Sequence, residues 1–382
     1  MKKGWKLITL GDACEKGSSN VSQNQLNDET GNYPIFGASG FIKNVSFFHN
    51  KKPYLSIIKD GSGVGRVMKM DAYTSVIGTL QYLYPKEDID LNYLYYSLIS
   101  IDFKKYIAGA AIPHIYFKDY KNEPFLWMPL PEQQRIVSIL DECFAAIDKA
   151  KANAEQNLKN AKELFESYLQ GVFENKGEGW EEKKLQDIAK VFGRGKSKHR
   201  PRNWEGLFGG KYPFIQTGDV RNANKYITNY TQTYNEVGLS QSKLWNKGTI
   251  CITIAANIAE TAILKFDACI PDSIIGFQVD DKKADINFTY YLLQYFKAEL
   301  QKLGKGSAQD NINLGTFENK YFPFPVIKEQ QIIVSQLDTL RAETQKLEAL
   351  YQKKIADLEE LKKSVLKKAF AGELKTEKAV AV

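Results

Sequence analysis

The sequence predicts an α+β fold in which two similar globular domains occur in tandem. Two long antiparallel helices separate the domains, with coiled-coil-like packing and pseudo-two-fold symmetry. Three observations lead to this prediction. The chain of 382 residues contains an internal duplication, each copy includes short β-type runs, and each copy ends in a long stretch of helical periodicity.

The duplication is clearest in one phrase near the end of each copy. PEQQRIVSIL begins at Pro131, and KEQQIIVSQL begins at Lys328, about half the chain later. Weaker matches join GWKLITLGD (4–12) to GWEEKKLQD (179–187), and LNYLYYSL (91–98) to INFTYYLL (286–293). A repeat of nearly half the chain indicates two domains, because the units of a solenoid are much shorter.

The stretch that follows each repeated phrase is predicted to be one long helix. From Glu132 to Phe173 there is no proline, and apolar residues recur at gaps of three, four and seven. The second copy has the same pattern, so each helix of roughly 40 residues is about 60 Å long. Since each helix carries a single apolar stripe, we expect the two to pack on each other. The end of the second should then lie beside the chain start at Trp5.

The globular parts are predicted to mix strands and helices. The strands expected from apolar and β-branched runs are 53–59, 74–84, 248–255 and 274–279, and the helices are 91–107 and 287–303. The predicted boundaries are 1–130 for the first domain, 131–174 for the central helix, 175–327 for the second domain, 328–374 for the distal helix and 375–382 for a tail.

Composition and motifs favour a binding protein over an enzyme. The formal net charge of +7 permits a nucleic-acid partner without requiring one. Four scattered cysteines indicate a reduced, cytoplasmic protein with no metal site, and no segment reads as a secretory signal or membrane span. The GKS at 195–197 lacks the first glycine of a phosphate-binding loop, and GSGVGR (61–66) is expected to form a tight turn. No catalytic motif appears, and no cofactor is expected.

A basic segment in the second domain is the main candidate for nucleic-acid contact. GRGKSKHRPRNW (193–204) carries Arg194, Lys196, Lys198, Arg200 and Arg202. Such cations can neutralise phosphates, and arginines can read base edges; the alternative is a solvated surface loop. The corresponding segment 15–28 is polar but not basic, which fits either two readers of different sequences or simple drift. Further candidates for DNA contact are Lys43, Lys59, Arg66, Gln216, Arg221, Asn257, Gln309 and Asn311.

At this level of detail the chain resembles the DNA-specificity subunits of type I restriction–modification systems. The resemblance covers nearly the whole chain. It rests on PLPEQQRIV and PVIKEQQIIV, the two GW starts, ITIAANIAETAIL (252–264) and KKAFAGEL (367–374). This sequence has Ala259 and Glu260 where the family often has Gly and Lys. It also has Lys328 in place of the proline at Pro131.

The resemblance implies a function and partners. Each globular part would be a target-recognition domain, and the chain would be a non-catalytic subunit that recognises a bipartite sequence in double-stranded DNA. It would direct two methyltransferase (modification) subunits and the restriction (motor-nuclease) subunits to that sequence. Two alternatives remain open: a stand-alone bivalent DNA-binding scaffold, and an enzyme that acts alone on DNA.

The two helix starts are the predicted docking surface for the methyltransferase subunits. A duplicated chain offers the same patch twice, as two copies of one partner require. The residues predicted to make this contact are Gln133, Gln134, Ile136, Ile139, Gln330, Gln331, Ile333 and Val334.

Overall fold

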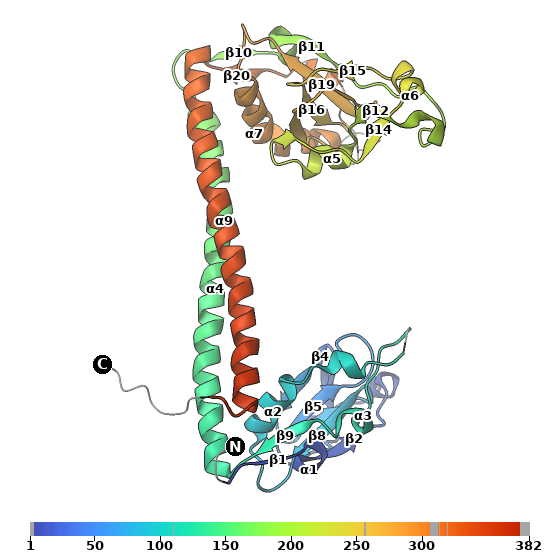
Figure 1. Ribbon diagram of the computed structural model, residues 1–382, viewed down its shortest axis with the longest axis vertical. Coiled ribbons are helices and arrows are strands. Elements are labelled where there is room, and N and C mark those ends of the chain that lie inside the picture. The colour runs from blue at the N-terminus through green and yellow to red at the C-terminus, as the bar shows by residue number, and fades with distance from the viewer. Residues whose placement is uncertain are drawn as a thin grey trace, which may run out of the picture. The chain divides into compact units, whose positions relative to one another are not determined.

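The computed structural model describes residues 4–109, 111–255, 257–305, 312, 314–318 and 320–374 (Figure 1). The chain forms two compact units, Met1–Gln156 with Tyr351–Val382, and Asn157–Leu350. We call them unit 1 and unit 2. Each contains one globular domain and one part of each long helix, α4 (Leu130–Glu174) and α9 (Ile327–Phe370). In the described part of the chain, no helix combines the length and apolar character needed to cross a membrane.

Among its described residues the domain of unit 1 forms three sheets. One is the antiparallel pair of β1 (Lys6–Thr9) and β9 (Pro124–Trp127). The second has the order β2 (Cys14–Ser18), β8 (Leu80–Pro85), β5 (Tyr54–Ile58), β6 (Val67–Met70). The third has the order β4 (Gly40–Val45), β3 (Tyr33–Gly37), β7 (Ser75–Val76). The helices are α1 (Leu10–Ala13), α2 (Leu91–Ile99) and α3 (Phe117–Tyr120), with 3-10 turns η1 (Gln23–Leu26) and η2 (Phe103–Tyr106).

The domain of unit 2 repeats this plan. Its pair is β10 (Glu181–Lys183) with β20 (Phe322–Phe324). Its larger sheet has the order β11 (Ala189–Arg194), β19 (Ile274–Val279), β16 (Ile250–Thr253), β17 (Thr261–Leu264), β13 (Tyr226–Ile227). Its other sheet has the order β14 (Gln232–Tyr234), β12 (Phe208–Phe214), β18 (Ala268–Cys269), β15 (Leu244–Trp245). The helices are α5 (Thr217–Asn222), α6 (Glu236–Ser240), α7 (Ile286–Lys305) and α8 (Leu314–Glu318), with 3-10 turns η3 (Leu185–Ile188) and η4 (Glu205–Leu207).

The two domains share their strand order. The order β2-β8-β5-β6 in unit 1 corresponds to β11-β19-β16-β17 in unit 2. The parallel pairing of β3 with β7 corresponds to that of β12 with β18. The predicted tandem two-domain α+β fold is therefore confirmed.

Two of the predicted elements differ from the structure. The helix expected over 91–107 ends at Ile99, because Asp102 caps a new 3-10 turn by accepting a hydrogen bond from the Lys104 backbone N–H at 3.1 Å. The strand expected over 74–84 is split in two, since the Gly78 N–H leaves the sheet to donate to the Val21 carbonyl. The turn predicted at 61–66 is confirmed, with positive φ at its three glycines.

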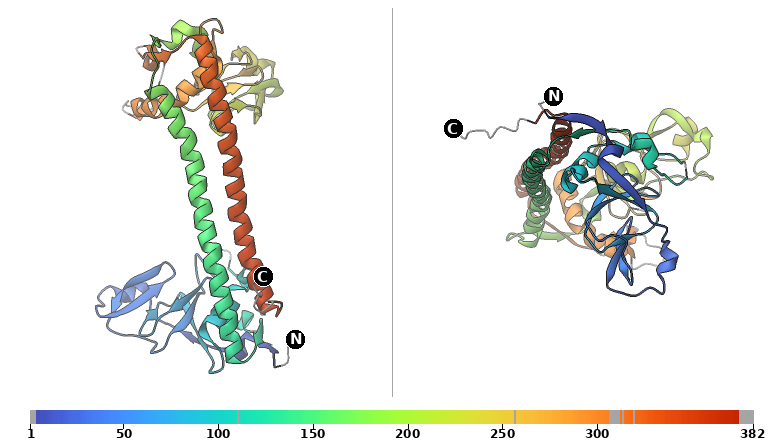
Figure 2. Two further views of the ribbon diagram at one scale, coloured as in Figure 1. Left: turned by 90° about the vertical axis from the view of Figure 1, so that its left-hand side faces the viewer. Right: turned by 90° about the horizontal axis from the view of Figure 1, so that it is seen from below.

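Within each unit the long helices pack against each other in antiparallel order (Figure 2). In unit 1 the ion pairs Lys151–Glu359 (2.7 Å) and Asp148–Lys362 (2.8 Å) join α4 to α9. In unit 2 the Tyr168 hydroxyl donates to Gln336 at 3.1 Å. The predicted antiparallel packing is confirmed inside both units.

The end of α9 docks beside the start of the chain, as predicted. The Phe370 ring lies 5.2 Å from the Tyr93 ring, and both belong to the core that includes Trp5. The helix ends in a glycine cap: the Glu373 N–H donates to Lys368, and Gly372 has a φ of 75°. A side chain at Gly372 would approach the Trp5 ring to 3.2 Å, so glycine allows this close contact.

The first glutamine of each repeated phrase makes hydrogen bonds inside its own unit. The buried Gln133 accepts a hydrogen bond from the Asp90 N–H at 2.9 Å, and its amide donates to the Met128 carbonyl at 2.7 Å. Asp90 in turn caps α2. The first repeated glutamine of α4 therefore ties its helix to the N-terminus of the neighbouring domain helix.

Unit 2 repeats the same contacts. Gln330 is also buried, accepts from the Asp285 N–H at 2.8 Å and donates to the Pro325 carbonyl at 2.7 Å. Asp285 accepts from the backbone N–H groups of Asn287 and Phe288 at the start of α7. The duplicated phrase thus encodes one structural junction twice.

Candidate nucleic-acid interface

The basic segment of unit 2 leaves the edge strand β11 and is held by its backbone. The Gly195 N–H donates to the Ile274 carbonyl at 2.8 Å, and the Lys196 N–H donates to the Ile270 carbonyl at 2.9 Å. A side chain at Gly195 would lie 2.3 Å from the Pro271 carbonyl oxygen, so only glycine fits there. The backbone of this segment is therefore fixed while its side chains reach outward.

Burial alternates along the segment as it does in a strand. Gly195 and Ser197 are buried, whereas Arg194, Lys196 and Lys198 are exposed. The alternation places three cations on the solvent side of the domain. No ion pair of the Lys196 or Lys198 ammonium is found in the described part of the chain, so both can meet an anion from outside.

The three arginines converge on one residue, Asp272, in the turn between β18 and β19. Arg194 donates from Nε and a terminal nitrogen to the Asp272 carbonyl at 2.9 and 2.6 Å. Arg202 donates to the Asp272 carboxylate at 2.6 Å, and an Arg200 terminal nitrogen lies 3.6 Å from the same oxygen. Asp272 thus gathers cations that are separated in sequence.

An exposed aromatic side chain completes the segment. The Trp204 ring is 46% exposed and stacks on His199, with ring centroids 4.8 Å apart and planes at 14°. Such a platform can stack on a base.

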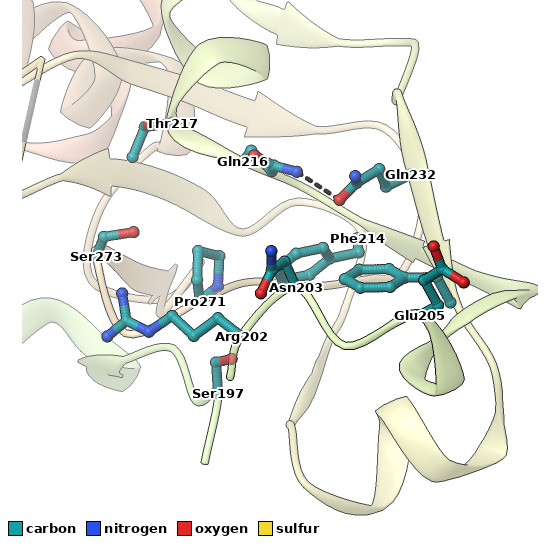
Figure 3. Close-up of a pocket in the computed structure, with 11 residues that line it drawn as sticks. Ser197, Arg202, Asn203, Glu205, Phe214, Gln216, Thr217, Gln232, Pro271 and Ser273 are labelled. Atoms are coloured by element: carbon teal, nitrogen blue, oxygen red, sulfur yellow. Dashed lines mark hydrogen bonds between the residues drawn. The ribbon is translucent and has the colours of Figure 1, made fainter. Parts of the chain in front are cut away.

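A pocket of about 590 Å³ lies next to the basic segment (Figure 3). Phe208 and Phe214 line it, and the Phe214 ring stacks on the ring of the buried Tyr234 with 4.1 Å between the ring centroids. Burial raises the pKa of Tyr234 and keeps its phenol neutral. The polar side chains that line the pocket are Ser197, Arg202, Asn203, Glu205, Gln216, Thr217, Gln232 and Ser273. The pocket therefore offers an aromatic wall and a mixed set of donors and acceptors.

The other residues predicted for unit 2 fall into separate groups. Gln216 lines the pocket, where its amide donates to Gln232. Arg221 and Asn257 form a pair of their own, with the guanidinium 3.4 Å from the amide oxygen. Gln309 and Asn311 lie outside the described residues.

The three cations predicted for unit 1 are engaged with the protein itself. The Lys43 ammonium donates to the Leu26 carbonyl at 2.8 Å, and Arg66 donates to the Ala38 carbonyl. Lys59 lies 3.8 Å from Asp60. Only Arg66 is exposed, so unit 1 presents a far less basic surface at these positions than unit 2 does.

The predicted partner surface needs correction. Gln133 and Gln330 are buried in the junctions described above, and Ile136 and Ile333 lie in the hydrophobic cores. Buried side chains cannot meet a partner at the surface, so the prediction was wrong for these four. Gln134 and Gln331 are exposed and Ile139 and Val334 are partly exposed, so they stay predictions.

Several residues of the site escaped the sequence analysis. Asp272, Gln232 and Ser273 are far from the basic segment in sequence. The pairing of β11 with β19 brings Asp272 and Ser273 to it, and the pairing of β12 with β14 brings Gln232 to the pocket. Trp204 had a signal, because an aromatic residue inside a basic run is typical of nucleic-acid binding.

A family model described as the type I restriction modification DNA specificity domain matches residues 2–159 and 177–359. The chain belongs to this family. The two matches coincide with the two copies of the duplication. Ala259, one of the departures from the resemblance named above, has a φ of 62°, in the left-handed region that glycine favours.

Curated relatives agree with the family. The chain is 26% identical to the specificity subunit of the type I restriction enzyme MjaVIII of Methanocaldococcus jannaschii. That alignment covers 97% of this chain and 93% of the relative. It is 23% identical to the specificity subunit of the EcoDI enzyme of Escherichia coli, over 97% of this chain and 88% of the relative.

Solved structures show the same fold. A chain from a study of complex assembly and conformational transition of the type I R-M system has a TM-score of 0.78 at 17% identity, covering 98% of this chain and 99% of that chain. The HsdS subunit from Thermoanaerobacter tengcongensis has a TM-score of 0.62 at 18% identity, covering 98% of each chain. The chain is a DNA sequence specificity subunit of a restriction–modification system.

Proposed function

We propose that the two units read the two halves of a bipartite sequence in double-stranded DNA. One observation carries this proposal: the same strand order and the same glutamine junction occur twice, while the surface cations differ between the units. A shared scaffold with different surface side chains is what two readers of different half-sites need. In this proposal the chain itself is non-catalytic and acts in the cytoplasm.

The basic segment of unit 2 supplies two kinds of contact in this proposal. Lys196 and Lys198 neutralise backbone phosphates, which contributes affinity for every sequence. Arg200 and Arg202, with the amides that line the pocket, read base edges. The first kind positions the domain on the duplex, and the second kind selects the sequence.

The partners are two modification subunits, one at the start of each long helix, with restriction subunits added in the full complex. The candidate contacts are now the solvent-facing residues Gln134, Ile139, Gln331 and Val334. Exposed apolar side chains accompany them: Leu130 is 39% exposed, and Ile332 is 59% exposed. An apolar side chain flanked by polar groups suits a protein interface.

Co-expression with the modification subunits of its own host tests the function. The chain should co-purify with them, and methylome sequencing of the host should reveal one bipartite target. Exchange of residues 1–130 for the same part of a relative should change one half-site and leave the other. A chain that binds a specific sequence but retains no modification subunit would instead be a stand-alone scaffold. DNA modified by the pure chain with Mg²⁺ and S-adenosylmethionine would make it an enzyme.

A further inference from the structure

The three arginines around Asp272 are held in unequal ways. Arg194 uses one whole edge of its guanidinium on the Asp272 carbonyl, with two hydrogen bonds. Arg200 donates to the carbonyls of Ser197 and His199, both at 2.8 Å. The one hydrogen bond found for Arg202 in the described structure runs from a terminal nitrogen to the Asp272 carboxylate. Of the three, Arg202 keeps the most donors for an outside partner.

The turn that carries Asp272 is held by backbone hydrogen bonds. The Ile274 N–H donates to the Pro271 carbonyl at 3.0 Å, and the same turn accepts hydrogen bonds from the backbone of the basic segment. The carboxylate is oriented as well, because its Oδ1 atom is buried and its Oδ2 atom meets Arg202. A fixed carboxylate can therefore fix the direction of the guanidinium.

Stability does not explain this carboxylate well. The Arg202 side chain is 52% exposed, and ion pairs this open to water contribute little to folding. The buried Oδ1 atom has no hydrogen-bond partner in the described structure, which is unfavourable for a charged group. A negative charge also opposes DNA binding, so a basic surface that retains one uses it for something other than attraction.

Arg202 also lines the pocket, to which Asn203, Gln216 and Gln232 contribute as well (Figure 3). The Arg202 guanidinium is bonded to the carboxylate through one terminal nitrogen, so its other nitrogens remain as donors in one plane. That pattern matches the O6 and N7 acceptors of guanine in the major groove. An unrestrained arginine would lose side-chain freedom on meeting the base, and Asp272 imposes that restriction in advance.

We propose that Asp272 is a positioning residue for specificity, which holds Arg202 so that it reads one guanine in the half-site of unit 2. This inference rests on the proposed function and adds to it a base and a residue. It also gives two of the arginines different roles. Arg202 contacts the guanine, whereas Arg194 holds the basic segment to the turn that carries Asp272.

The test uses the complex of the chain with its modification subunits and the target found by methylome sequencing. Dissociation constants are measured for the target and for duplexes with each pair of the unit 2 half-site replaced, at several salt concentrations. The variants are Asp272→Asn and Arg202→Lys, with Asp281→Asn as the control. Asp281 is an exposed carboxylate of unit 2 that pairs with Lys190 at 2.6 Å, so its loss changes the net charge equally.

Arg202→Lys keeps the charge and loses the planar fork. The preference for one G·C pair over its replacements, measured as a ratio of dissociation constants, should fall by about 5- to 150-fold. The dependence of affinity on salt should stay unchanged, because the charge is kept. Asp272→Asn should weaken discrimination at the same pair by about tenfold, while affinity for unrelated DNA rises slightly. Asp281→Asn should change neither ratio.

Three results would overturn the inference. Asp272→Asn could raise or lower the affinity for all duplexes by the same factor, as a pure effect of charge or folding would do. Arg202→Lys could leave every discrimination ratio intact, or the unit 2 half-site could contain no G·C pair. In each case the proposed function would still hold if the wild-type complex prefers its target. A wild-type complex without such a preference would contradict both the proposed function and the inference about Asp272.

Discussion

Replacement of Asp338 by alanine should destabilise unit 2 far more than the equivalent replacement of Asp141 destabilises unit 1. Both aspartates lie on long helices and accept a hydrogen bond from a tyrosine of the neighbouring domain helix, Tyr291 and Tyr96 respectively. Asp338 has one additional partner, the ammonium of Lys225. The two variants therefore form a matched pair that differs by one buried cation.

The geometry sets the expected magnitude. The Lys225 side chain is 5% exposed, whereas Asp338 is 45% exposed. Loss of one partner of a buried ion pair costs about 3–5 kcal/mol, because the remaining charge is left without compensation. Water near Asp338 and the face of the Tyr291 ring, 4.7 Å from the ammonium, offset part of this cost. We therefore expect Asp338→Ala to lower the free energy of unfolding of unit 2 by about 3 kcal/mol, the low end of that range. Asp141→Ala, which loses only a hydrogen bond, should lower that of unit 1 by about 1 kcal/mol.

Hydrogen exchange measured by mass spectrometry separates the two units. A loss of about 3 kcal/mol should lower protection in α7 and β13 by about a hundredfold, and a loss of about 1 kcal/mol should lower protection in α2 by less than tenfold. Lys225 also has a φ of 102°, a strained conformation for a non-glycine residue. Peptides that contain it should show the largest change.

The pH dependence has a definite sign. Desolvation lowers the pKa of Lys225, and Asp338 opposes that shift. Without Asp338 the pKa falls further, so folded Lys225 loses its proton earlier as the pH rises toward 10.5. The deficit of the variant should be greatest at neutral pH and should shrink with rising pH. Equal losses in the two variants, or a deficit that grows with pH, would refute this account of the ion pair.

Three further outcomes are expected. Ile136→Asp and Ile333→Asp should lower the unfolding midpoint of the chain, since both side chains are buried; a folded variant that merely loses its modification subunit would contradict their burial. Replacement of Lys196 and Lys198 by glutamine should flatten the dependence of log K on log salt by about 0.9 per lost phosphate contact, and an unchanged slope would make the segment a solvated loop. Burial raises the pKa of Tyr84 to about 12 and raises that of other tyrosines, so the folded chain holds protons that the unfolded chain loses. Urea midpoints should therefore fall as the pH rises from 10 to 12, and a constant midpoint would contradict this.

The repeated glutamines show what a pattern can and cannot predict. The duplication and the helical spacing are properties of the chain alone, so the fold and the long helices followed from them. The role of Gln133 did not, because its partners are backbone groups of Met128 and Asp90. Nothing in a sequence distinguishes a glutamine that docks a partner from one that satisfies backbone groups inside its own domain.

The basic segment was predicted in part. Its charges were visible in the sequence, and the structure exposes Lys196 and Lys198 as the strand-like alternation requires. Asp272 was not visible as part of the site, because a single aspartate more than sixty residues away carries no signal in an ordinary composition. The pairing of β11 with β19 is what brings it beside Arg194.

The comparison of the two units also explains how one scaffold can serve two readers. The contacts that define the fold lie at the helix starts, where Gln133 and Gln330 make the same bonds. The basic segment of unit 2 follows the edge strand β11, and its backbone is held at Gly195 and Lys196 by hydrogen bonds to the turn before β19. A substitution such as Arg202→Lys therefore changes a surface donor without loosening the core. Under this arrangement the half-sites can diverge independently while both junctions stay intact, which is the pattern that the duplicated sequence displays.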